Sequence, residues 1–276
     1  MAIITLTTDF GEKDHFAGAV KGAIYSESED FKIVDISHSV SPFNIPEAAY
    51  IVQNSYMSFP KGTVHIIGID GELHPENRHI AVKLDGHYFV CADNGIISIM
   101  TEEIAPEKMV EINIHGSSLP ETTTLDTFVK VACHLARGGT LEVIGKAIDS
   151  LKPTKSMLPF VNDEQNQIIG SVIYVDNYGN VVSNIRKKFF ESVQKGRSYE
   201  VQARSYKFDR VLSKYSDIVD FDVPEASRNV EGKKMAIFNT SGHLEIAVYK
   251  SDNATVGSAS KLLGLQLRDT ISVNFV

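Results

Sequence analysis

The sequence predicts an α/β N-terminal domain with a mostly parallel sheet, followed by a small all-β, barrel-like C-terminal domain. Strand and helix patterns alternate through residues 1–150, as in proteins whose parallel strands are joined by helices. Short strand patterns with little helical periodicity fill residues 167–276. Between them, residues 151–166 contain two prolines and few periodic apolar positions, which is typical of an interdomain linker.

The elements of the N-terminal domain follow from apolar spacing and from turn residues. Phe16, Val20 and Ile24 recur at helical spacing and predict the first helix. The turn residues Asp85-Gly86 predict a hairpin between two later strands. The expected strands are residues 3–7, 32–36, 63–69, 79–84 and 88–92, and the expected helices are residues 16–26, 45–59 and 127–137.

The C-terminal domain is expected to consist mainly of strands. These are residues 168–175, 181–185, 198–203, 234–238, 244–249 and 270–275. The basic triplet Arg186-Lys187-Lys188 follows the second of them and is expected at the solvated edge of a helix. We therefore expect a barrel or sandwich with few helices.

Composition and charge exclude several classes of function. Of 276 residues, 43% are hydrophobic and 22% are charged, as in globular proteins, and no apolar run approaches the ~18 residues of a membrane span. Acidic residues outnumber basic ones by 35 to 27, so we expect neither a nucleic-acid nor a membrane partner. Cys91 and Cys133 lie among apolar neighbours and are expected to be buried, reduced thiols of a cytoplasmic protein. Residues 1–6 lack the basic region of a signal peptide and are expected to begin a strand.

Polar side chains follow three of the expected N-terminal strands. Asp9, His38 and Asp70 each come just after such a strand. Ligands of open parallel sheets bind beyond the carboxyl ends of the strands, so two carboxylates and a histidine are expected at one edge. The alternative is that each aspartate only forms a turn or caps a helix.

Two polar turns of the C-terminal domain are open to the same two interpretations. Asp176-Asn177-Tyr178-Gly179-Asn180 and Asn239-Thr240-Ser241-Gly242 each follow a strand and suit a β-turn. The first could also present Asp, Tyr and Asn to a ligand that carries an amine and a flat ring. The nine histidines are scattered, without His-x-x-x-His or Cys-x-x-Cys, so no metal site is expected. Phosphate-binding glycine loops and a Gly-x-Ser-x-Gly motif are absent from the sequence as well.

Six segments occur in a characteristic order along the chain. They are Thr7-Thr8-Asp9-Phe10-Gly11, Val34-Asp35-Ile36-Ser37-His38, Pro60-Lys61-Gly62-Thr63-Val64-His65, Asp93-Asn94-Gly95, Asp176-Asn177-Tyr178-Gly179-Asn180 and Glu245-Ile246-Ala247-Val248. In this order and spacing they resemble the S-adenosyl-L-methionine hydroxide adenosyltransferases, a family that also contains the 5′-fluoro- and 5′-chloro-5′-deoxyadenosine synthases. The resemblance runs from about residue 3 to the C-terminus.

The resemblance implies a substrate, an assembly and a reaction. S-adenosyl-L-methionine (SAM) would be the substrate, without a cofactor, and a homotrimer would form active sites from one subunit's N-terminal domain and a neighbour's C-terminal domain. Water or a halide attacks C5′ of the ribose, and methionine leaves from the sulfonium. Because the sulfur departs as a neutral thioether, the protein must chiefly align the reactants and exclude bulk water. When water is the nucleophile, a held carboxylate typically accepts its proton.

The resemblance also implies roles for three residues of the N-terminal domain. Asp9 would hold the ribose diol, and Phe43 would pack on the nucleoside. Asp14, together with Asp176 of the C-terminal domain, would meet the methionine ammonium group.

Further contacts with the substrate would come from the C-terminal domain. Tyr178 and Asn180 would contact adenine, Asn180 by hydrogen bonding. The Thr240-Ser241 turn would bind the methionine carboxylate, and the backbone near Val248 would read the adenine edge.

The expected catalytic positions match the hydrolytic members only in part. Asp70 matches their water-activating Asp. Their Arg falls on Asn77, with Arg78 adjacent and able to serve after a loop shift. Their His falls on Thr123. His74 and His79 flank the altered loop and are either exposed loop residues or replacements for the missing group.

The sequence therefore predicts hydrolysis of SAM to adenosine and L-methionine, with Asp70 as the general base. A non-catalytic SAM- or adenosine-binding protein is the first alternative, and a halogenase that makes 5′-halo-5′-deoxyadenosine is the second. A carboxylate beside a halide costs on the order of several kcal/mol in a dry pocket, whereas a water nucleophile uses that carboxylate.

Overall fold

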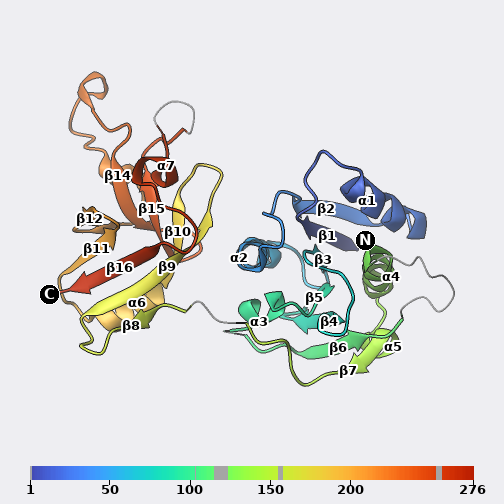
Figure 1. The fold of residues 1–276 in the computed structure, drawn as a ribbon. Coiled ribbons are helices and arrows are strands. Elements are labelled where there is room, and N and C mark those ends of the chain that lie inside the picture. The colour runs from blue at the N-terminus through green and yellow to red at the C-terminus, as the bar shows by residue number, and fades with distance from the viewer. Residues whose placement is uncertain (1, 103, 115–123, 155–157, 253–256) are drawn as a thin grey trace. The chain divides into compact units, whose positions relative to one another are not determined.

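The computed structural model describes residues 2–102, 104–114, 124–154, 158–252 and 257–276. The chain divides into two compact units, Met1–Lys155 and Ser156–Val276 (Figure 1). The first is an α/β unit and the second is a β unit, which confirms the predicted fold class. Among the described residues, no helix has the length and apolar character needed to cross a membrane.

The first unit contains a seven-stranded sheet with the order β2-β1-β3-β5-β4-β6-β7. Strands β2, β1, β3 and β5 run parallel, and β4, β6 and β7 pair antiparallel with their neighbours. The hairpin predicted at Asp85-Gly86 joins β4 to β5. The strands are β1 (Ile3–Thr8), β2 (Lys32–Ser37), β3 (Val64–Gly68), β4 (His79–Leu84), β5 (His87–Ala92), β6 (Lys108–Ile112) and β7 (Gly145–Ala147).

Helices cover both faces of this sheet (Figure 1). One apolar core joins the strands to α1 and α4, and a second core joins them to α2 and α3. Both cores are needed because parallel strands are buried on their two faces. The helical segments are α1 (Phe16–Glu27), α2 (Ile45–Ser55), η1 (Tyr56–Ser58), α3 (Ile96–Met100), α4 (Thr124–Ala136) and α5 (Leu141–Ile144).

The second unit forms a barrel-like sheet around one large apolar core, with a second, smaller apolar cluster at β13, β14 and β15. Its strand order is β12-β11-β16-β9-β10-β15-β14-β13, with β8 paired to β9. All pairs are antiparallel except β13 with β14. The strands are β8 (Phe160–Val161), β9 (Gln167–Val175), β10 (Val181–Arg186), β11 (Tyr199–Ala203), β12 (Tyr206–Phe208), β13 (Val211–Leu212), β14 (Lys234–Phe238), β15 (His243–Val248) and β16 (Thr270–Phe275).

Helical segments interrupt these strands at four places. They are α6 (Lys187–Gln194), η2 (Tyr215–Ile218), η3 (Glu225–Ser227) and α7 (Ala259–Leu263). The basic triplet lies at the start of α6, as predicted, because Arg186 caps that helix and Lys187 begins it. Strand β8 lies inside the segment expected to be a linker, where its two residues pair with β9.

Cys91 and Cys133 are free and buried, as expected from their apolar neighbours. Burial raises the pKa of the Cys91 thiol, and the charge of Asp93 adds to the effect. Burial raises the pKa of Cys133 to about 11, with a further contribution from Glu27. Both thiols therefore remain protonated near neutral pH and act as small apolar groups of the core.

Two buried imidazoles lie on neighbouring strands of the first unit. His65 on β3 and His87 on β5 place Nε2 and Nδ1 3.2 Å apart, and the Thr5 hydroxyl lies 2.7 Å from Nδ1 of His65. The Phe89 ring stacks on His65 at 4.9 Å, and the Tyr56 ring contacts both imidazoles edge-on. Burial lowers the pKa of His65 to about 3, with a contribution from the neighbouring His87.

Acid should therefore destabilise the first unit through His65. Its pKa is lower in the folded chain than in the unfolded one, so its stabilising effect is complete above about pH 6.5 and is lost as the pH falls toward about 3. The loss between about pH 6.5 and about pH 5 is on the order of 2 kcal/mol. Urea unfolding at these two pH values should show that the free energy of unfolding decreases less for His65→Gln than for the parent chain. The exposed His15→Gln should behave as the parent chain does, and an unchanged pH dependence in His65→Gln would contradict the assignment.

Candidate active site

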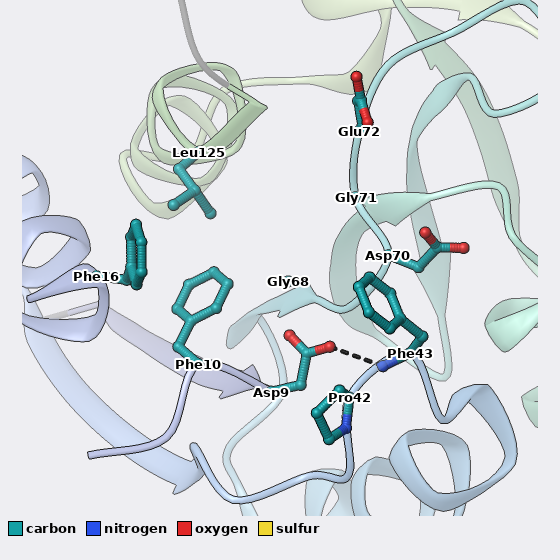
Figure 2. Close-up of a pocket in the computed structure, with 10 residues that line it drawn as sticks. All are labelled: Asp9, Phe10, Phe16, Pro42, Phe43, Gly68, Asp70, Gly71, Glu72 and Leu125. Atoms are coloured by element: carbon teal, nitrogen blue, oxygen red, sulfur yellow. Dashed lines mark hydrogen bonds between the residues drawn. The ribbon is translucent and has the colours of Figure 1, made fainter. Parts of the chain in front are cut away.

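The carboxyl ends of the parallel strands bring together residues that are distant in the sequence. Asp9 follows β1 and Asp70 follows β3, and both line one cavity of about 610 Å³ (Figure 2). The prediction that two aspartates lie at this edge is therefore confirmed. His38, after β2, is buried with Nδ1 2.7 Å from the Thr8 hydroxyl and is not among the residues that line the cavity. The cavity is lined by Asp9, Phe10, Phe16, Pro42, Phe43, Gly68, Asp70, Gly71, Glu72 and Leu125.

A backbone amide that comes from another segment of the cavity lining holds the Asp9 carboxylate. The Phe43 amide donates a hydrogen bond to Oδ2 of Asp9 at 2.9 Å, the dashed line in Figure 2. Phe43 adopts a φ of 59°, which is uncommon for a residue with a side chain, and its ring is 72% exposed. The bond therefore fixes one carboxylate oxygen while the aromatic ring remains available at the cavity wall.

Asp70 lies in a left-handed backbone conformation, with a φ of 44°. Such a conformation costs about 1–2 kcal/mol for a residue with a side chain and persists only when its surroundings hold it. Asn77 supplies part of that support, because its Nδ2 donates to the carbonyl oxygens of Asp70 at 2.9 Å and of Glu72 at 3.0 Å. The Asn77 side chain is buried, so these bonds are shielded from water.

Two further side chains complete what we call the carbonyl clamp, formed by Asn77, His79 and Asn94. Nε2 of His79 lies 2.9 Å from the Gly71 carbonyl oxygen, and Nδ2 of Asn94 donates to the Ile69 carbonyl at 2.8 Å. Every carbonyl of residues 69–72 therefore has a side-chain partner. The expectation of an exposed loop histidine holds for His74 and is wrong for His79, which is buried at the start of β4.

The cavity is acidic and otherwise apolar. Asp9, Asp70 and Glu72 supply three carboxylates, and the other seven lining residues are apolar side chains or glycines. Of the lining residues in the described part of the chain, none carries a positive charge. Such a site attracts cations and opposes anions, most strongly where water is excluded.

Arg78 is engaged away from this cavity. Its Nε donates to Asp93 Oδ2 at 2.9 Å, one terminal nitrogen lies 3.4 Å from Glu111 Oε2, and the other donates to the Ser150 carbonyl at 2.6 Å. The structure thus brings Asn77, and not Arg78, to the backbone of Asp70. Sequence alignment alone left this choice open because the two residues are adjacent.

Two further predicted positions are placed differently. Asp14 is exposed in the turn before α1 and is not among the residues that line the cavity. Thr123 lies outside the described residues.

A second cavity, of about 410 Å³, lies in the second unit. It brings together four predicted residues, Asp176, Tyr178, Asn180 and Val248. Its remaining lining residues are Tyr215, Tyr249, Lys250 and Ser251. Sequence reasoning missed Tyr215, which comes from the short helix η2 in a region with no regular pattern. Only its place in the folded unit identifies it.

Asp176 and Asn180 form a tight pair at this cavity. Oδ1 of Asp176 accepts the Asn180 amide at 2.8 Å, and its Oδ2 accepts Nδ2 of Asn180 at 2.9 Å. A carboxylate only accepts, so the Asn180 amide nitrogen must face it and the amide oxygen must point elsewhere. That oxygen is buried and has no hydrogen-bond partner in the part of the chain that the structure describes. The Asn180 amide oxygen is therefore an acceptor that the described part of the chain leaves unused.

The predicted Thr240-Ser241 turn joins β14 to β15 and does not line the second cavity. Asn239 holds it, because its Oδ1 accepts the amides of Ser241 and His243, each at 3.1 Å. Thr240 is exposed, and Ser241 is partly exposed. No group of three or more His, Cys, Asp or Glu side chains among the described residues could hold a metal ion.

The fold is that of a two-unit protein, an α/β unit and a β unit, and each unit contains one of the two cavities. The chain belongs to the SAM hydroxide adenosyltransferase family: the N-terminal domain of that family matches residues 4–145, and its C-terminal domain matches residues 170–272. The resemblance seen in the sequence is thereby confirmed.

The curated relatives have two kinds of name, SAM hydrolase and fluorinase. A protein of Methanocaldococcus jannaschii named (R)-S-adenosyl-L-methionine hydrolase is 28% identical over 98% of this chain and 95% of its own. A fluorinase of Actinopolyspora mzabensis is 22% identical over 89% of this chain and 90% of its own. Among solved structures, an uncharacterized conserved protein from Thermotoga maritima matches with a TM-score of 0.81 and 29% identity, covering 99% of both chains.

Removing one member of the carbonyl clamp should loosen residues 69–72. Asn77→Ala removes the Glu72 carbonyl's donor and leaves the Asp70 carbonyl only a 3.5 Å bond from Nδ2 of Asn94, which should cost about 1–3 kcal/mol of stability and speed amide hydrogen exchange around Asp70. Exchange mass spectrometry at peptide resolution measures this. The matched control is Asn54→Ala, which removes one exposed Nδ2–carbonyl bond on α2 and should leave these amides unchanged. Equal protection in both variants would show that the clamp does not hold the loop.

Proposed function

We propose that this protein hydrolyses SAM to adenosine and L-methionine by attack of water at C5′, with Asp70 as the general base. The observation that carries the proposal is Asp70 itself, fixed by the carbonyl clamp at an acidic and otherwise apolar cavity. SAM is a cation at sulfur and at its ammonium group, so an acidic cavity suits it. The curated relatives named SAM hydrolase support the same reaction.

The reaction balances without a cofactor. The water oxygen forms a bond to C5′ as the C5′–S bond breaks, and the electron pair of that bond remains on sulfur. Methionine leaves as a neutral thioether, and Asp70 accepts the proton that the attacking water loses. The protein contributes alignment and a site of low water content, for which Phe10, Phe16 and Leu125 supply apolar wall.

In the first cavity, we assign Asp9 to the ribose diol and Phe43 to the face of the nucleoside. The Phe43 amide already occupies one oxygen of Asp9, which holds the carboxylate in one orientation. Asn77 acts on the base through the backbone rather than by touching water. Asp14 is assigned to the methionine ammonium group together with Asp176.

In the second cavity, we assign the adenine ring to Tyr178, Asn180 and the backbone near Val248. The unused amide oxygen of Asn180 suits the exocyclic amino group, and the aromatic wall suits a flat heterocycle. The Thr240-Ser241 turn is assigned to the methionine carboxylate. We also propose the homotrimer that the family resemblance implies.

Two other functions remain as alternatives. A SAM- or adenosine-binding protein without turnover is favoured by one observation, the engagement of Arg78 with Asp93 and Glu111 away from Asp70. Halogenation has relatives named fluorinase in its favour. The three carboxylates of the first cavity oppose it, because none of the described lining residues offsets their repulsion of a halide.

Replacing the base should separate chemistry from binding. Asp70→Asn should lower adenosine formation at least about 100-fold, because the amide cannot accept the proton, and should leave adenosine affinity within about threefold. Incubation with SAM, with and without chloride, followed by mass-resolved chromatography, measures the products. The exposed Asp30→Asn serves as control.

Each outcome of that incubation selects one function. Adenosine and methionine formed together by the parent chain support hydrolysis, and a chloride-dependent 5′-chloro-5′-deoxyadenosine peak would replace it with halogenation. Intact SAM that nevertheless binds saturably would support the binding protein. Undiminished turnover in Asp70→Asn would remove Asp70 from its proposed role.

The Asn180 oxygen should make the second cavity select for an amino group. Adenosine should bind about 10–100-fold more tightly than inosine, whose keto oxygen would face that acceptor. Asn180→Ala should reduce this ratio toward one, while the exposed neighbour Asn177→Ala should preserve it. Calorimetric titration of both nucleosides gives the ratio, and equal affinities in the parent chain would contradict the assignment.

A further inference from the structure

A buried carboxylate of the second unit has no assigned part in binding or catalysis. Glu245 on β15 is 3% exposed. Burial raises the pKa of its carboxyl group, hydrogen bonds from Tyr215 and Asn239 lower that pKa in part, and the charge of Asp176 raises it. A buried acid of this kind costs stability, which sets Glu245 apart from the apolar residues beside it on β15.

The two oxygens of Glu245 contact two different parts of the unit. Oε1 accepts the Tyr215 hydroxyl at 2.6 Å, and Oε2 accepts Nδ2 of Asn239 at 3.1 Å. Tyr215 lines the second cavity, and Asn239 begins the turn that carries Thr240 and Ser241. One carboxylate therefore connects a wall of the cavity with the turn between β14 and β15.

The orientation of Asn239 makes this connection directional. Its Oδ1 accepts the amides of Ser241 and His243, so its Nδ2 must face Glu245. A flipped amide would lose both turn bonds and would place two oxygens against each other. The Asn239 side chain thus transmits the position of Glu245 to the backbone of the turn.

We propose that Glu245 is a positioning residue that couples the adenine site to the methionine-carboxylate site. This inference rests on the proposed function, because it takes SAM as the ligand that uses both sites. Glu245 touches no substrate. It sets the Tyr215 ring at one end and the Thr240-Ser241 turn at the other, so that both ends of one extended ligand find their partners at a fixed separation.

Three variants at this network test the coupling. Glu245→Gln keeps an oxygen for Asn239 and turns an amide donor toward the Tyr215 oxygen, so SAM affinity should stay within about threefold. Glu245→Leu removes both bonds and should weaken SAM about tenfold or more, and adenosine less, because adenosine does not reach the turn. Tyr215→Phe removes only the cavity end and should weaken both ligands by the same factor.

The measurement is calorimetric titration of SAM and adenosine into each full-length variant, with thermal unfolding recorded in parallel. The exposed Glu191→Leu on α6 is the matched control and should bind both ligands as the parent does. Because Glu245 has a raised pKa, the stability that its carboxyl group supports is present at acidic pH and lost as the pH rises, so Glu245→Gln should unfold at a higher temperature near neutral pH. A purely structural role would not separate SAM from adenosine.

Distinct results overturn distinct statements. Folded Glu245→Leu that binds SAM and adenosine as tightly as the parent overturns the coupling and leaves the proposed function intact. A parent chain that binds neither ligand overturns the proposed function and the coupling with it. If Glu245→Leu does not fold, Tyr215→Phe decides, and unchanged affinity for both ligands in that variant overturns the coupling.

Discussion

The backbone at Asp70 is the constraint on which the first cavity depends. A left-handed aspartate is unfavourable alone, and here four consecutive carbonyls from residue 69 to residue 72 are held by side chains, of which Asn77 and His79 are buried. The donors come from the segment before β4, from β4 itself and from the segment after β5. The position of one carboxylate thus depends on the pairing of β3, β5 and β4, and the loop can be polar and rigid because the strands beneath it are fixed.

The two cavities differ in the charged and polar groups that line them. The first gathers Asp9, Asp70 and Glu72 among apolar side chains and favours positive charge. In the second, both oxygens of Asp176 accept hydrogen bonds from Asn180, and the Asn180 amide oxygen has no partner among the described residues. Under the proposed function, the cationic sulfonium of SAM would use the first environment and its uncharged base the second.

Much of this architecture could be predicted from local patterns, and the rest depends on contacts between distant residues. The alternation of strands and helices predicted the sheet, and the polar residues after β1 and β3 predicted its reactive edge. The sequence could not show whether Asn77 or Arg78 contacts Asp70, because the two residues are adjacent and only the folded chain determines which of them is buried beside Asp70. His79 begins β4 as expected, but its burial could not be predicted, because it follows from pairing with Ala92 on β5 and from contact with the Gly71 carbonyl. No sequence pattern indicated that Tyr215 would line a cavity, because a short 3-10 helix such as η2 has no hydrophobic periodicity.

Strand β3 has a consequence for how activity would respond to acid. It carries His65 near one end and leads into Asp70 at the other, so the strand that presents the proposed base also contains the imidazole that resists protonation. A loss of activity toward acidic pH would then have two causes. One is protonation of a carboxylate, and the other is destabilisation of the unit that contains β3. Unfolding is cooperative and visible by spectroscopy, so only the loss of activity that precedes any spectral change reports on chemistry.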